Sequence, residues 1–162
     1  MRWGLEAQMN AVCSQPDKIN YRSWETGKPH GHTDLYNVRD RFGAPYWQVF
    51  RPAYHKILLQ AALRSGAELR KGCEIIDYIP EDGVVALADG TKIQGDLVIA
   101  ADGIKSIARK AMGIDTEPNE TGDTCFRVVI PAEKLLADPD LAELSTRPGF
   151  EQWLGPDHHI IG

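Results

Sequence analysis

The sequence predicts an α/β protein, and three features of its apolar pattern lead to this prediction. Residues 96–112 begin with a nearly continuous apolar run (DLVIAAD) and continue with helical spacing. Such a run is typical of a strand that is buried on both faces of a parallel sheet. An amphipathic helix is indicated at 52–65, and strand-type alternation separates it from residue 96. These patterns predict a mixed α/β fold.

The first 50 residues are predicted to hold one helix and three strands. Leu5, Met9 and Val12 have helical spacing, which predicts an amphipathic helix within residues 2–13. A turn is predicted at 27–33, because this segment is rich in Gly, Pro and His. The predicted strands are 19–24, 34–38 and 45–50.

Residues 52–65 give the clearest helix, since Pro52 suits a first turn and Gly66 follows the last one. Three antiparallel strands are predicted after it, at 67–79, 83–88 and 91–95, with Asp-Gly turns between them.

The rest of the chain is predicted to contain a strand–turn–helix unit and then alternating elements. In that unit the strand is 96–101, the turn 102–105 and the helix 106–112. A further strand is predicted at 123–131, one or two short helices at 132–144, and strand structure within 150–162.

Composition and charge exclude several classes of protein. The chain has 162 residues, 18 basic against 23 acidic, and a net charge of −5, which argues against a nucleic-acid partner. Its longest apolar run is far shorter than a membrane span, and no signal-type segment follows Met1, so we expect a cytoplasmic protein. The histidine pairs, His30 with His32 and His158 with His159, lack a carboxylate cluster, so no metal site is predicted.

Residues 102–109 admit two interpretations. Asp102 follows a strand, Gly103 allows close approach of a ligand, Ser106 can cap the helix, and Arg109 adds a cation. A pyrophosphate or ribityl group could be held there, because ligands bind beyond the carboxyl ends of strands in open α/β sheets. The same residues are equally typical of a turn, a cap and a surface charge.

Several segments, in order along the whole chain, resemble FAD-dependent aromatic-ring hydroxylases, the class A flavoprotein monooxygenases of the salicylate hydroxylase-like branch. They include RWGL near the start, VFRPAYHKILLQAAL, GAELRKGCEI, DLVIAADGIKSIAR, TGDTCFRVVIP and WLGPDHHII. The resemblance implies FAD as cofactor, NADH or NADPH as co-substrate, and a small aromatic substrate that is hydroxylated with O2. It also implies a partial FAD-binding domain of Rossmann type at 1–120 and the start of a mixed-sheet substrate domain at 121–162, to which 14–44 could also contribute.

The resemblance also implies roles for single residues. Asp102 and Gly103 match the family's Asp-Gly motif, which holds FAD and handles the nicotinamide cofactor, and Ser106 and Arg109 belong to the same cofactor-binding segment. Arg51 matches an arginine that reaches the FAD pyrophosphate, a task suited to a bidentate guanidinium. Ile75 lies on the strand that lines the adenine, and Arg127 could face the flavin or the carboxylate of a substrate.

The chain also departs from the family pattern. Ala53 stands where the family has an acidic residue, and neither the glycine-rich G-x-G-x-x-G turn nor the later Gly-Asp motif is found. Two hypotheses follow: the chain is a fragment of the monooxygenase, or it is a truncated, non-catalytic relative that does not bind flavin stably. In either case we expect the chain alone to purify without flavin and, through exposed sheet edges, to self-associate.

Overall fold

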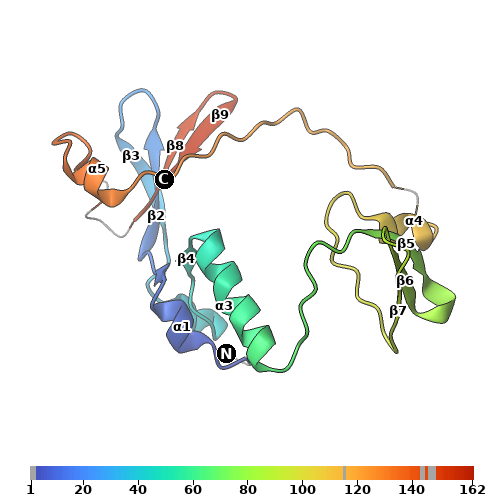
Figure 1. Cartoon of the computed structure of the whole chain (residues 1–162). Helices are drawn as coiled ribbons and strands as arrows, with labels where there is room; N and C mark the ends of the chain where they lie inside the picture. The colour runs from blue at the N-terminus through green and yellow to red at the C-terminus, as the bar shows by residue number, and fades with distance from the viewer. Residues whose placement is uncertain (1–2, 115, 143–144, 146–148) are drawn as a thin grey trace. The chain divides into compact units, whose positions relative to one another are not determined.

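The computed structural model describes residues 3–114, 116–142, 145 and 149–162, which divide into two compact units (Figure 1). Unit 1 comprises residues 1–67 and 128–162, and unit 2 comprises residues 68–127. Both contain helices and strands, so the predicted mixed α/β class is confirmed.

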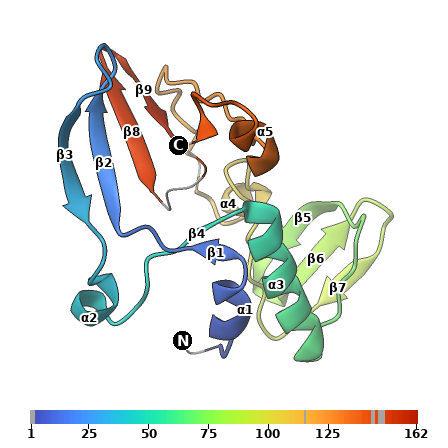
Figure 2. The same cartoon turned by 90° about the vertical axis from the view of Figure 1, so that its left-hand side faces the viewer.

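Unit 1 is built on a mixed sheet of four strands in the order β3-β2-β8-β9, which lie side by side in Figure 2. The central pair, β2 and β8, is parallel, whereas both outer pairs are antiparallel. The sheet therefore joins two distant parts of the chain. Its strands are β2 (Lys18–Ser23), β3 (Pro29–Asp34), β8 (Phe150–Gly155) and β9 (His158–Ile161).

One sequence prediction fails in this sheet. The strand after β2 is Pro29–Asp34, almost all of it within the segment predicted to be a turn, and no strand forms at 35–38. The turn lies earlier, where Gly27 N–H donates to Ser23 O at 2.9 Å. β3 forms despite its composition because it pairs along its length with β2.

A half-buried polar cluster links β2 to β8. Glu151, whose side chain is 14% exposed, accepts from Arg22 Nε at 2.5 Å and from Asn20 Nδ2 at 2.6 Å. Arg22 also donates through Nη1 to Gly27 O at 3.1 Å. The cluster fixes the register of the parallel pair, because both carboxylate oxygens of Glu151 are held by β2.

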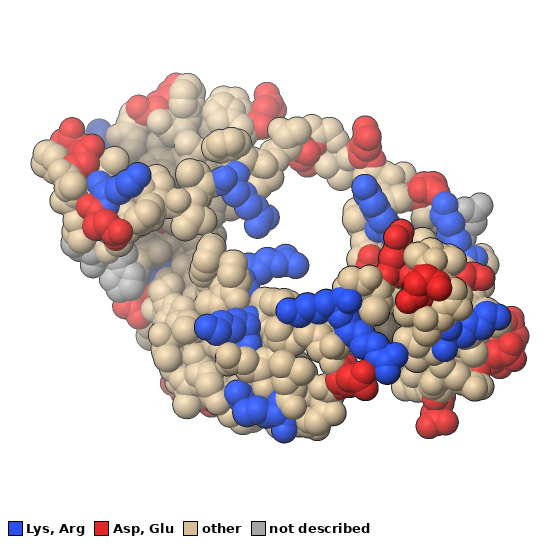
Figure 3. Space-filling view, in the orientation of Figure 1, with Lys and Arg blue, Asp and Glu red and all other residues tan. Residues whose placement is uncertain are grey.

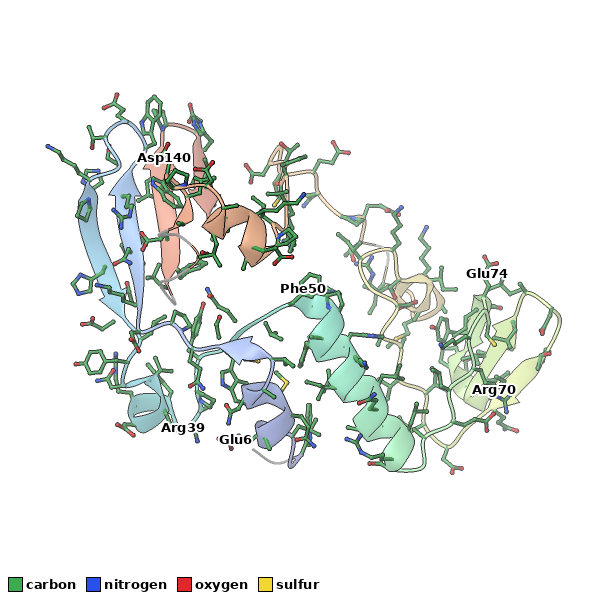
Figure 4. All side chains as sticks on the ribbon, turned by 60° about the vertical axis from the view of Figure 1, so that its left-hand side comes forward. Glu6, Arg39, Phe50, Arg70, Glu74 and Asp140 are labelled. Carbon is green, nitrogen blue, oxygen red and sulfur yellow. The ribbon has the colours of Figure 1, made fainter. Side chains whose placement is uncertain are left out.

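The other described elements of unit 1 are three helices and a short strand pair before residue 68, and the helix α5 after residue 127. The long helix α3 (Arg51–Arg64) confirms the predicted helix; Phe50 lies at its start in Figure 4. Arg39 and Glu6 form an ion pair of 2.5 Å, also visible in Figure 4. The other elements are α1 (Glu6–Asn10), β1 (Cys13–Ser14), α2 (Val38–Phe42), β4 (Gln48–Val49) and α5 (Ala132–Leu136).

Unit 2 is an antiparallel meander of three strands, as predicted, with α4 packed against β5 (Figure 1). Its first strand is shorter than predicted, because residues 67–74 form no strand. The chain turns at Gly83, which has φ +62° after a short 3-10 turn, and at Gly90. Val85, Leu87 and Ala108 are its buried apolar residues. The elements are β5 (Ile75–Ile79), η1 (Pro80–Asp82), β6 (Val84–Leu87), β7 (Lys92–Gln94) and α4 (Ile107–Ala111).

Two predicted strands are wrong. Residues 96–101 form no strand, and Leu97 and Ile99 are 78% and 80% exposed. Residues 123–131 also form no strand, and Phe126 is 93% exposed. Neither segment pairs with another strand among the described residues, and an apolar sequence alone does not make a strand without a ladder of hydrogen bonds.

Acidic and basic side chains are interspersed over the surface seen in Figure 3. No helix within the described ranges is both long and apolar enough to cross a bilayer.

Candidate functional site

The Asp102 carboxylate lies at the first turn of α4 and binds its backbone. Oδ2 accepts from Ile107 N–H at 3.0 Å and from Ala108 N–H at 3.3 Å. The neighbouring Ser106 side chain is the largest cause of a lowered pKa of Asp102; burial opposes this shift, and the backbone N–H groups of Ala108 and Ile107 lower the pKa further. Asp102 is therefore a carboxylate that organises the turn and the start of the helix.

Ser106 is the cap of α4, as its spacing predicted. Its Oγ accepts from Arg109 N–H at 3.4 Å. Ser106 N–H in turn donates to Gly103 O at 3.1 Å. The two side chains and the turn thus form one hydrogen-bonded unit.

The turn presents three backbone N–H groups, those of Gly103, Ile104 and Lys105. Gly103 has φ +77°, a conformation that other residues rarely adopt, and no atom lies within 4 Å of where its Cβ would be. Within the described residues, the N–H groups of Gly103, Ile104 and Lys105 have no hydrogen-bond partner. Free N–H groups in a turn are suited to an anion.

A small open pocket of about 150 Å³ lies beside this turn and carries three cations. Lys105, Arg109 and Lys110 line it, together with the acidic Glu117, 3.6 Å from Lys110 Nζ. Arg109 donates through Nη2 to Ile104 O, and its Nε is buried without a partner among the described residues. The excess of positive charge makes the pocket compatible with a phosphate or another anion.

Ile75 lies on the covered face of the meander. It is directly opposite the buried Leu87, and Tyr78 is opposite the buried Val85. A register shift between Ile75 and Asp77 places Ile75 and Tyr78 on the same face, where strict alternation would separate them. Ile75 thus contributes to packing under α4.

Tyr78 is a site residue that the sequence analysis missed. Burial raises the pKa of Tyr78, and the negative charge of Asp102 and a hydrogen bond to its carboxylate raise it further. Tyr78 lies on this face because the pairing of β5 with β6 is shifted by one residue. A single sequence does not reveal such a shift, so it could not have indicated the position of Tyr78.

The structure thus brings together four of the predicted site residues, Asp102, Gly103, Ser106 and Arg109, with Ile75 on the strand against which α4 packs. Arg51 is the exposed first residue of α3 and belongs to unit 1. Arg127 is exposed and lies in the extended segment at the end of unit 2.

Comparisons with known proteins identify the relatives of the chain. The family model described as "FAD binding domain" matches residues 2–157. FAD-dependent monooxygenase OpS4 of Beauveria bassiana is 31% identical over 99% of the chain, which covers 39% of that protein. 3-Hydroxybenzoate 6-hydroxylase 1 of Aquipseudomonas alcaligenes is 34% identical over 90% of the chain, which covers 36% of it.

The fold also matches solved structures. HpxO of Klebsiella pneumoniae, complexed with FAD and uric acid, aligns with a TM-score of 0.66 at 22% identity over 98% of the chain and 39% of HpxO. FqzB aligns with a TM-score of 0.67 at 23% identity over 93% of the chain and 34% of FqzB. The chain spans less than half the length of these relatives and structures. Because the family model matches almost all of it, the chain belongs to the family of FAD-binding domains.

Proposed function

We propose that the chain forms part of an FAD-dependent monooxygenase that uses NADH or NADPH and O2 to hydroxylate a small aromatic acid. The observation that carries the proposal is the turn at 103–105, which offers free N–H groups beside three cations in a chain of an FAD-binding family. A pyrophosphate needs this combination of backbone donors and positive charge.

The residues around the turn fit such a cofactor. Gly103 leaves open space where a side chain would stand, and Lys105 and Arg109 bring positive charge to the pocket. We assign Asp102, Gly103, Ser106, Arg109 and Ile75 to the cofactor site on the side of unit 2, and Arg51 to the pyrophosphate. When bound, FAD supplies the redox chemistry that activates O2.

The substrate class is inferred from the relatives. They include enzymes named for 3-amino-4-hydroxybenzoate, 3-hydroxybenzoate and 6-hydroxynicotinate, each an aromatic ring with a carboxylate. We propose a salicylate-like substrate of the same kind, with Arg127 as a partner of its carboxylate, since a guanidinium binds a carboxylate through two parallel hydrogen bonds.

The mixed sheet supports a substrate domain that draws on two parts of the chain. β2 and β3 pair with β8 and β9 in one sheet, so we propose that 14–44 joins 121–162 in this domain. The remainder of 1–120 would then belong to the FAD-binding domain.

A chimera tests the proposed function. Residues 1–162 replace the matching segment of 3-hydroxybenzoate 6-hydroxylase 1, and the purified protein is assayed for bound flavin and for NADH oxidation stimulated by hydroxybenzoates. We expect flavin to be retained and NADH oxidation to respond to the aromatic acid. The 162-residue chain alone is expected to purify colourless, because it lacks a glycine-rich turn for the pyrophosphate.

A charge reversal localises the flavin to unit 2. In the chimera, Lys105→Glu is expected to weaken FAD binding about tenfold or more, because it reverses a charge in the pocket. Lys92→Glu, on the exposed strand β7, is the matched control and is expected to bind FAD normally. A folded chimera without flavin, or equal affinities for both variants, would contradict the proposed site.

A further inference from the structure

The Arg109 side chain folds back from α4 onto the turn that precedes the helix. Its Nη2 donates to Ile104 O, and its Nε is buried without a partner among the described residues. The backbone of Arg109 also joins the turn, since its N–H donates to Ser106 Oγ at 3.4 Å. The guanidinium is therefore held against the backbone of the turn, although the residue also lines the pocket.

The hydrogen bond to Ile104 O fixes the direction of one free N–H group. A trans peptide is planar, and its C=O and N–H point in opposite directions. Because Ile104 O is directed to Arg109, the N–H of Lys105, which belongs to the same peptide, points away from the guanidinium. The preceding peptide is fixed in the same way, because Gly103 O accepts from Ser106 N–H at 3.1 Å.

The two peptides differ in what holds them. Gly103 O is held by a backbone donor, whereas Ile104 O is held by a single side chain. An anion bound at the Lys105 N–H would lie on the far side of that peptide from the guanidinium. Arg109 can therefore act on such an anion by holding the peptide, without contacting the anion.

We propose that Arg109 is a positioning residue, whose guanidinium holds the Ile104 carbonyl and thereby keeps the Lys105 N–H free for a cofactor phosphate. The proposal rests on the proposed function for what the turn binds, but the positioning itself involves only residues of unit 2. It sharpens the assignment of Arg109 to the cofactor site, because the residue acts there through the turn.

Two variants of Arg109 and one control separate position from charge. Arg109→Met removes the guanidinium, while α4 keeps its cap, because Asp102 and Ser106 accept from backbone N–H groups. Arg109→Lys keeps the charge but replaces the planar fork with a more strongly hydrated ammonium. Lys110→Met is the matched control in the same helix and pocket; within the described part of the chain, the Lys110 side chain pairs with Glu117 and not with the turn.

The first measurement is nitrogen-15 relaxation of the backbone at Ile104 and Lys105 in the full chain. We expect order parameters near the ~0.85 of rigid backbone in the wild type and in Lys110→Met, and below about 0.6 in Arg109→Met and Arg109→Lys. The signals of α4 show whether the helix stays folded; if it unfolds in Arg109→Met, Arg109→Lys alone decides. Wild-type order parameters in Arg109→Met, or their full recovery in Arg109→Lys, would overturn the proposal.

The second measurement connects the turn to the cofactor. In the chimera, Arg109→Met is expected to weaken FAD binding about tenfold, because the donors of the turn are no longer held in place. Most of this loss is expected to remain at about 1 M salt, where the Debye length is only ~3 Å. The loss in Lys110→Met is expected to be smaller and to shrink at that salt concentration, because this variant removes only a charge.

The outcomes distinguish the two proposals. If the chimera binds no flavin while the relaxation results hold, the proposed function fails and the positioning role stands. If Arg109→Met and Lys110→Met weaken FAD binding equally at about 1 M salt, where charges are screened, positioning by Arg109 is refuted while flavin binding remains.

Discussion

Residues 29–34 and 96–101 show opposite relations between sequence and structure. The first segment contains proline, glycine and two histidines and yet forms β3, whereas the second is the most strand-like sequence of the chain and forms no strand. β3 pairs with β2, and residues 96–101 pair with no strand among the described residues. A partner strand, rather than strand propensity, therefore decides whether these segments become strands.

Proline substitutions test this comparison most directly, and their expected effect is the largest. Tyr21→Pro, in the middle of β2 between two neighbouring strands, is expected to lower the free energy of unfolding by about 3 kcal/mol, because it removes a ladder donor from a central strand. Val98→Pro is expected to change it by less than about 0.5 kcal/mol. Urea unfolding followed by circular dichroism measures both, and a large loss in Val98→Pro would show that 96–101 is paired after all.

The second-largest effect on stability is expected at the polar cluster between β2 and β8. Glu151→Gln is expected to lower the free energy of unfolding by about 2 kcal/mol, because it leaves the half-buried Arg22 without its counter-ion. Tryptophan fluorescence is a suitable probe, since all four tryptophans lie in unit 1. Glu68→Gln breaks an exposed ion pair with Arg70 and is expected to have no measurable effect. Similar unfolding curves for the two variants would mean that the cluster does not hold the parallel pair.

The smallest effect is a local dependence on pH in the turn that follows 96–101. The pKa of Asp102 is lowered in the folded chain, so the ionised carboxylate stabilises the folded turn. This stabilisation is complete above the ordinary pKa of 3.8 and is lost as the pH falls through the lower pKa of the folded state. Amide signals of Ile107 and Ala108 are therefore expected to change below pH 3.8 in the wild type but not in Asp102→Asn. Asp89→Asn, in the turn between β6 and β7, is the control and should leave this transition in place.

The elements predicted correctly from the sequence are those that depend on interactions between residues close together in the chain. α3 was predicted at 52–65 and is found at Arg51–Arg64, and the Ser106 cap and the meander also agree, because capping, helical periodicity and Asp-Gly turns act over a few residues. The sequence did not predict the pairing of β2 with β8, since nothing in either segment identifies a partner so distant in the chain.

The same division applies to the candidate site. The turn at Gly103 and the Ser106 cap were predicted from the spacing, whereas the hydrogen bond from Ile107 N–H to the Asp102 carboxylate was not. Tyr78 was missed because strict alternation places it on the opposite face of the sheet from Ile75. The register shift in β5 brings the two residues to the same face. The roles proposed for Arg51 and Arg127 stay predictions.

The parallel pairing of β2 with β8 has a consequence for the order of folding. Asn20 and Glu151 are 131 positions apart, and unit 2 lies between them in the chain. The β2–β3 hairpin and the meander close short loops and can form early, whereas β8 must search for β2 across a long loop. On a ribosome, β2 therefore emerges long before its central partner is synthesised, and its unpaired edge is exposed to aggregation or to chaperones throughout that interval.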